Sequence, residues 1–119
     1  MTGDRTLCAL AMACLLTQAS AHAFLDHSDP RVGGTVSVSP AEVRLWFTEP
    51  IEPAFSTLSV VDSAGKPVDM GDAQVNSSDH QLLRVSLRKL PPGRYSVVWR
   101  VVSVDTHVTQ GDFAFRVGD

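Results

Sequence analysis

The residues of this 119-residue chain that are best suited to chemistry are a carboxylate and an imidazole two positions apart. Asp105 and His107 belong to the segment Ser103-Val-Asp-Thr-His107. In an extended segment, side chains at positions i and i+2 point to the same side. The pair could therefore bind a metal ion, or it could be a turn in which Asp105 orients His107 through a hydrogen bond. The spacing leaves both possibilities open, because a metal site needs at least one further ligand.

The start of the chain has the three parts of a secretory signal peptide. Arg5 supplies a charged start, residues 7–16 form an apolar run, and residues 19–23 are a cluster of mostly small side chains. The apolar run is too short to span a bilayer, which takes about 20 residues. We therefore expect residues 1–21 to be a signal peptide and residues 22–119 to be one exported domain.

The position of signal cleavage decides whether a third ligand exists. Cleavage after Ala21 leaves His22 as the first residue, with a free α-amine and an imidazole that can close a six-membered chelate ring around one ion. Cleavage after Ala23 begins the chain at Phe24 instead and discards that chelate. The preference for small residues at the cleavage site accepts either position.

The remaining polar residues suggest no second site. The sequence has no nucleophile elbow, no glycine-rich phosphate loop and no H-E-x-x-H motif. His27 alternates with Leu25, which favours a surface position away from His22, and His80 falls in a polar segment, residues 73–80, that we expect to be a loop. Three further acidic residues are interpreted as ordinary surface carboxylates: Glu49, Glu52 and Asp112.

Composition limits the function further. Both cysteines lie within residues 1–21, so the exported domain has no disulfide and no thiolate ligand. The net charge of −3 argues against nucleic acid as a partner. About 98 residues suffice for one domain with one core.

Apolar residues alternate with polar ones in short runs between Gly- and Pro-containing turns, which is the pattern of β-strands. The clearest runs are residues 43–47, 58–60, 83–87, 95–101 and 113–117. No stretch has helical periodicity over helical length. We predict an all-β fold, a small Greek-key sandwich or barrel of the immunoglobulin-like or cupredoxin-like kind, with about seven strands and with Trp46 and Trp99 in its core.

The sequence resembles the CopC family of periplasmic copper-binding proteins over residues 22–119. The segment 22–30, HAFLDHSDP, is similar to the mature start of that family, and LWFTEP at 45–50 followed by AFS resembles a second stretch. The most diagnostic run is 92–107, which contains W-R-V-V-S-x-D-x-H. Val108 departs from the family, which usually has Pro after this His.

The resemblance implies one Cu(II) ion per chain, bound by the α-amine and imidazole of His22, by Asp105 and by His107. Three nitrogens and one carboxylate oxygen suit tetragonal Cu(II). Some relatives carry a methionine-rich Cu(I) site. Only Met70 would remain here after cleavage, so the sequence indicates a member that binds Cu(II) alone.

The resemblance also implies a function and a partner. We expect a monomeric periplasmic protein, not an enzyme, that sequesters or carries Cu(II) or hands it to a CopD-type inner-membrane protein. One alternative is a monooxygenase-like redox enzyme with a histidine-brace centre, although Asp105 would fill a position that an oxygen-activating copper should leave open. The other is a metal-free adhesion or chaperone sandwich.

Overall fold

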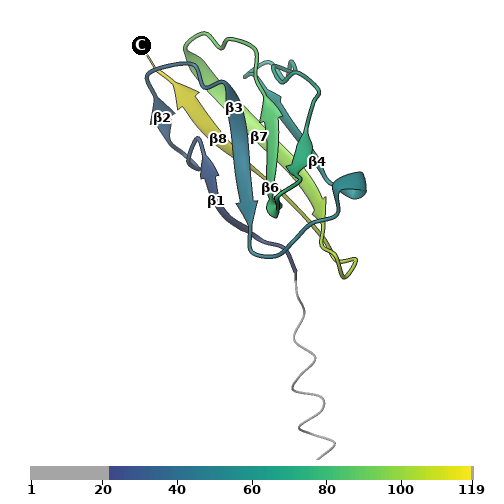
Figure 1. The fold of residues 1–119 in the computed structure, drawn as a ribbon. Helices are drawn as coiled ribbons and strands as arrows, with labels where there is room; N and C mark the ends of the chain where they lie inside the picture. The colour runs from purple at the N-terminus through teal and green to yellow at the C-terminus, as the bar shows by residue number, and fades with distance from the viewer. Residues whose placement is uncertain (1–21, 119) are drawn as a thin grey trace, which may run out of the picture.

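The computed structural model describes residues 22–118, so the predicted signal peptide lies outside the described residues. The described chain forms two four-stranded sheets that pack face to face (Figure 1). One sheet has the order β1 (Leu25–Asp29), β3 (Glu42–Phe47), β6 (Asp79–Ser86) and β5 (Gln74–Asn76). The other has the order β2 (Thr35–Val36), β8 (Val108–Val117), β7 (Gly93–Val102) and β4 (Thr57–Val61). A 3-10 turn, η1 (Pro53–Phe55), precedes β4.

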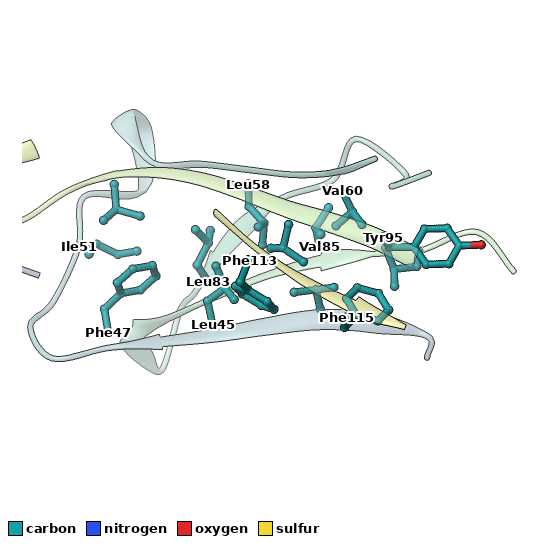
Figure 2. Packing of buried hydrophobic residues seen from close by; sticks show 14 of the residues in the cluster. Leu45, Phe47, Ile51, Leu58, Val60, Leu83, Val85, Tyr95, Phe113 and Phe115 are labelled. Atoms are coloured by element: carbon teal, nitrogen blue, oxygen red, sulfur yellow. The ribbon is translucent and has the colours of Figure 1, made fainter. Parts of the chain in front are cut away.

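The core lies between the two sheets and is built by the predicted alternation. Buried and exposed positions alternate along β3, β7 and β8 because successive side chains of a strand point to opposite faces. Figure 2 shows the buried side chains along the length of the sandwich, with Phe47 and Ile51 toward one end and Tyr95 and Phe115 toward the other. The predicted all-β sandwich is therefore confirmed.

The described residues form eight strands, where about seven were expected. Two details of the prediction were wrong. The polar segment 73–80 is not a loop, because β5 and the start of β6 lie within it. Trp46 is half-buried on the outer face of β3 and does not belong to the core cluster. Trp99 does pack against the core, as expected.

One end of the sandwich collects segments that are far apart in the sequence. Residues 22–24 and the β3–β4 connection lie at the same end as the β7–β8 loop, at the bottom of Figure 1, while the C-terminus lies at the opposite end. Every pair of neighbouring strands is antiparallel except β2 with β8. Among residues 22–118, no helix is long and apolar enough to cross a membrane.

Candidate metal centre

The β7–β8 loop, residues 103–107, is a tight turn and not an extended segment, and a turn was one of the possibilities that the spacing left open. The backbone N–H of Thr106 donates to the carbonyl of Ser103 at 2.8 Å, and the N–H of Ser103 donates to the carbonyl of His107 at 2.9 Å. Thr106 has a φ of 73°, a left-handed conformation that β-branched residues rarely adopt. The turn still directs Asp105 and His107 toward each other.

The side chain of Ser103 holds this loop in its conformation through hydrogen bonds. Its side chain is fully buried, and its hydroxyl donates a hydrogen bond to Oδ1 of Asp105. The same Oγ accepts a hydrogen bond from the backbone N–H of His107 at 3.2 Å. One buried hydroxyl thereby fixes both a carboxylate and the backbone of the imidazole residue next to it.

Asp105 and His107 form a solvent-accessible pair. Oδ1 of Asp105 lies 3.3 Å from Nδ1 of His107, and the two side chains are 41% and 45% exposed. The hydrogen bond from the Ser103 hydroxyl lowers the pKa of Asp105, and the neighbouring His107 lowers it further. The carboxylate is therefore ionised and available as an oxygen donor at neutral pH.

Hydrogen bonds hold Ala23 and Phe24 to segments of both sheets. Ala23 is fully buried, and its carbonyl accepts a hydrogen bond from the Thr109 hydroxyl of β8 at 2.6 Å. On the other side, the N–H of Phe24 donates to Oγ1 of Thr48 at 3.0 Å, and the N–H of Thr48 donates to the carbonyl of Phe24 at 2.8 Å. These bonds fix the direction in which His22 leaves the sandwich.

As a result, His22 lies over the β7–β8 loop. The ring centroids of His22 and His107 are 4.4 Å apart, with the rings tilted by 42°. The structure thus brings together His22, Asp105 and His107, all three residues predicted for the site. Within residues 22–118, no group of three or more His, Cys, Asp or Glu side chains is already arranged so that it could hold a metal ion.

The chemistry of the N-terminus decides whether a fourth donor is available. In the full-length sequence, the backbone nitrogen of His22 is bonded to Ala21 as a peptide nitrogen. It becomes a free amine only in a chain that begins at His22. Two of the expected donors then belong to the same residue, and the rings of His22 and His107 are already neighbours. The donor set therefore fits a divalent metal once that amine exists.

The other two histidines are exposed, as predicted. His27 is exposed, with Nδ1 2.6 Å from Oδ2 of Asp26, and its ring stacks on Trp46 at a centroid distance of 4.5 Å. His80 is exposed at the start of β6, where its backbone carbonyl accepts a hydrogen bond from Ile51. Both are surface residues in the structure.

Sequence reasoning did not anticipate the residues that support the site. Ser103 appeared only as one letter of the diagnostic run, and nothing in the spacing distinguished Thr48 or Thr109 from other strand-end threonines. Their roles depend on contacts between segments far apart in the sequence, which no local pattern encodes. Only the role of Ser103 could have been found from the strand pattern, since that pattern could have indicated a buried serine next to a carboxylate.

The fold and the site together define a β-sandwich protein in which an N-terminal histidine meets a carboxylate–imidazole pair at one end. The chain belongs to the CopC family. The family model described as CopC domain matches residues 25–118, which is most of the described chain.

Relatives and a solved structure agree with this assignment. The chain is 35% identical over 118 residues to the copper resistance protein C of Xanthomonas campestris pv. juglandis, covering 94% of this chain and 92% of that protein. The crystal structure of CopC from Methylosinus trichosporium superposes with a TM-score of 0.76 at 35% identity, covering 82% of this chain and 94% of that one.

A third relative is much longer. The copper transport protein CutJ of Bacillus subtilis is 33% identical over 99 residues, which are 82% of this chain but only 18% of CutJ. This chain therefore spans less than a fifth of that relative. The names of these relatives place the family in copper resistance and copper transport.

Proposed function

We propose that this protein, once cleaved after Ala21, binds one Cu(II) ion through the amine and imidazole of His22, the carboxylate of Asp105 and the imidazole of His107. The observation that supports this most directly is the 4.4 Å separation of the His22 and His107 rings, which come from opposite ends of the domain sequence. Asp105 stands 3.3 Å from His107 on the same loop.

The distances suit neighbouring ligands on one ion. Donors that each lie about 2.0 Å from a metal, as imidazole nitrogens do, are roughly 2.8 Å apart when they are adjacent corners of a square. The 3.3 Å between Asp105 and His107 needs only a small adjustment to reach that geometry. Copper stands highest among the divalent ions for nitrogen and oxygen donors, and tetragonal geometry is diagnostic of Cu(II).

The sequence supplies little for Cu(I), which selects soft sulfur ligands. The exported domain has no cysteine, and its single methionine, Met70, lies in the β4–β5 connection. That connection is at the end of the sandwich opposite the histidine cluster, because β4 ends and β5 begins there. The proposed cargo is therefore Cu(II).

The proposed role is to sequester or carry copper in the periplasm and to exchange it with a CopD-type inner-membrane protein. Export follows from the signal-like residues 1–21. A role in copper handling is supported by relatives named for copper resistance and copper transport. The exposed edge of Asp105 and His107 leaves the ion accessible to an exchange partner.

The proposal is tested by three chains that differ only at the N-terminus: one beginning at Ala21, one at His22 and one at Phe24. Cu(II) is titrated against each under a competing chelator, and the intact mass of the exported protein identifies the natural first residue. We expect affinity to fall more than roughly 100-fold in the chains that begin at Ala21 and Phe24, since even losing a ligand's hydrogen-bond partner typically costs 10- to 100-fold. Equal affinities in all three chains would exclude the amine as a ligand.

Matched variants test the other two donors in the chain that begins at His22. His107→Ala is compared with His27→Ala, and Asp105→Ala with Asp112→Ala. The two controls remove exposed residues of the same type that lie within strands β1 and β8. The proposal predicts weaker binding only in the first member of each pair, and it fails if the pairs behave alike.

A further inference from the structure

The end of the sandwich that carries the histidine cluster also exposes large apolar side chains. Phe24 is 58% exposed, Phe55 62%, Val104 55% and Val108 47%. These four residues come from the N-terminal segment, η1, and the β7–β8 loop with the first residue of β8. Phe24 also approaches the cluster directly, since its ring centroid is 5.7 Å from that of His22.

Backbone contacts join these segments into one surface. The N–H of Val104 donates to the carbonyl of Pro50 at 3.3 Å, and the N–H of Glu52 donates to the carbonyl of Val102 at 2.7 Å. The β3–β4 connection is thereby held beside the β7–β8 loop, and Thr48 holds the N-terminal segment against the same connection. In Figure 1 all three segments lie at the same end of the molecule.

The segments at this end contain acidic residues and no Lys or Arg. They are residues 22–24, 48–56, 77–79 and 103–108. Arg100 of β7 lies just beyond them, opposite Thr57 of β4. The carboxylates of these segments are those of Glu49, Glu52, Asp79 and Asp105. We call the four apolar residues and these carboxylates the copper-end surface.

The opposite end has a different composition. Its connections and strand ends include Arg31, Lys66, Arg88, Lys89, Arg94 and Arg116. Arg94 and Arg116 are direct partners across the β7–β8 ladder. The opposite end also has carboxylates, among them Asp62, Asp69 and Asp72. The two ends therefore differ in their cations, most of which lie away from the histidine cluster.

We infer that the copper-end surface is a docking site for the protein that exchanges copper with this one, and that the partner presents apolar side chains surrounded by Lys and Arg. This inference rests on the proposed function, because it places the docking site around the proposed copper ligands. Complementary charge steers encounter and fixes orientation, and an apolar centre excludes water around the ion during transfer.

The charge argues against two other occupants. A second copy of the chain would bring the same carboxylates face to face, and like charges across an interface are costly. Anionic lipid headgroups would be repelled for the same reason, since membranes attract basic segments. A copper transport partner is supported independently by CutJ, in which the matched region is covalently joined to a much longer remainder.

Copper loading reduces the docking charge but does not remove it. A bound Cu(II) ion adds two positive charges to the four carboxylates of Glu49, Glu52, Asp79 and Asp105, which leaves a net charge of −2. The loaded protein therefore still presents negative charge toward a basic partner. The electrostatic attraction between the loaded protein and a basic partner should therefore persist until the copper is transferred. Added salt should weaken this attraction because exposed charges are screened.

The experiment measures both binding and copper transfer between the chain that begins at His22 and a purified CopD-type membrane protein in nanodiscs of neutral lipid. The test variants are Glu49→Lys with Glu52→Lys, and Phe55→Ser with Val104→Ser. Two control variants change a matching residue elsewhere: Asp112→Lys and Val38→Ser. We expect each test variant to slow association and transfer about tenfold at low salt while Cu(II) affinity stays within about twofold.

The outcomes separate docking from copper binding. Binding to the CopD-type protein is also measured with the copper-free protein. If the protein did not bind Cu(II), the proposed function would be overturned, but the measurement of docking would still be valid. The inference is overturned if the CopD-type protein does not bind, or if test and control variants behave alike. It is also overturned if the test variants instead abolish self-association in sedimentation, or abolish binding to vesicles of anionic lipid.

Discussion

The Ser103 hydroxyl connects the two proposed loop ligands. It is buried, it donates to the Asp105 carboxylate, and it accepts from the backbone N–H of His107. Buried polar groups are costly unless they are paired, so this hydroxyl favours the one loop conformation in which all its partners are present. Preorganisation of this kind raises affinity, since the donors need not be ordered when the ion binds.

Replacing this hydroxyl should loosen the loop and weaken copper binding. We predict that Ser103→Ala lowers the free energy of unfolding by about 1 kcal/mol through loss of the hydrogen bonds. We predict in addition about a tenfold loss of Cu(II) affinity, as for other hydrogen-bond partners of ligands. Urea unfolding and Cu(II) titration measure the two effects. Ser59→Ala removes an exposed serine of β4 and should change neither, and affinity unchanged by Ser103→Ala would show that the hydroxyl does not position the ligands.

The site was only partly predictable from the sequence. The spacing of Asp105 and His107 indicated a pair and left open whether the segment is extended or a turn, and the structure shows a turn. The approach of His22 to His107 could not follow from spacing, since it depends on how Ala23 and Thr109 hold the N-terminal segment across the sandwich. The cleavage site suggested His22 as a further ligand, and the family resemblance placed it in one site with Asp105 and His107.

At the scale of elements, β7 and β8 form the longest strand pair, and they carry the candidate site on the loop between them. Trp99 of β7 is paired with Gly111 of β8. Its ring packs over that glycine and contacts Phe47 and Phe113, with centroid distances of 6.4 Å and 6.0 Å. The glycine is required by this close approach, because a Cβ at position 111 would lie 2.6 Å from the Trp99 ring.

Adding that Cβ should disturb the core beside the site. We predict that Gly111→Ala destabilises the fold by about 1–3 kcal/mol, the usual cost of overpacking, and alters the near-ultraviolet circular dichroism of the displaced Trp99. Gln110→Ala, at the exposed neighbouring position on the same strand, should leave both nearly unchanged. A Gly111→Ala protein as stable as the parent would mean that the Trp99 ring moves aside without cost.

The strands show where a sequence pattern is informative. Alternation identified β3, β7 and β8 because each buries one face in the core. It failed for β5, an edge strand whose residues Gln74–Asn76 are exposed or half-buried. Trp46 was assigned to the core together with the apolar residues of its run, but the same alternation that buries Leu45 and Phe47 directs Trp46 outward.

At the scale of the whole molecule, the proposed ion would link the N-terminus to the β7–β8 loop. Three of its four proposed donors are nitrogens, and they come from the two ends of the domain sequence. A ligand that binds the folded state and not the unfolded chain stabilises the fold by mass action. Copper should therefore act as a stabilising cross-link as well as cargo.

We predict that Cu(II) raises the free energy of unfolding of the chain that begins at His22 by about 2.7 kcal/mol when free copper is 100 times its dissociation constant. The chain that begins at Phe24 lacks two of the donors and should show little gain at the same copper concentration. Thermal and urea unfolding with and without Cu(II) measure the difference. An equal gain in both chains would locate the stabilising ion elsewhere.

The copper-dependent gain in stability should disappear on acidification before Asp105 titrates. The pKa of Asp105 is lowered in the fold, chiefly by Ser103. Its stabilising contribution is therefore complete above the unfolded value of about 3.9 and is lost only as pH falls through the lower folded value. Nitrogen donors must be free of protons to bind metal, so protons compete with the ion for them. The gain should thus fall as the pH is lowered toward about 5, whereas the stability of the copper-free chain should show no contribution from Asp105 over that range. If the gain persisted unchanged to pH 5, imidazole ligation of the ion would be wrong.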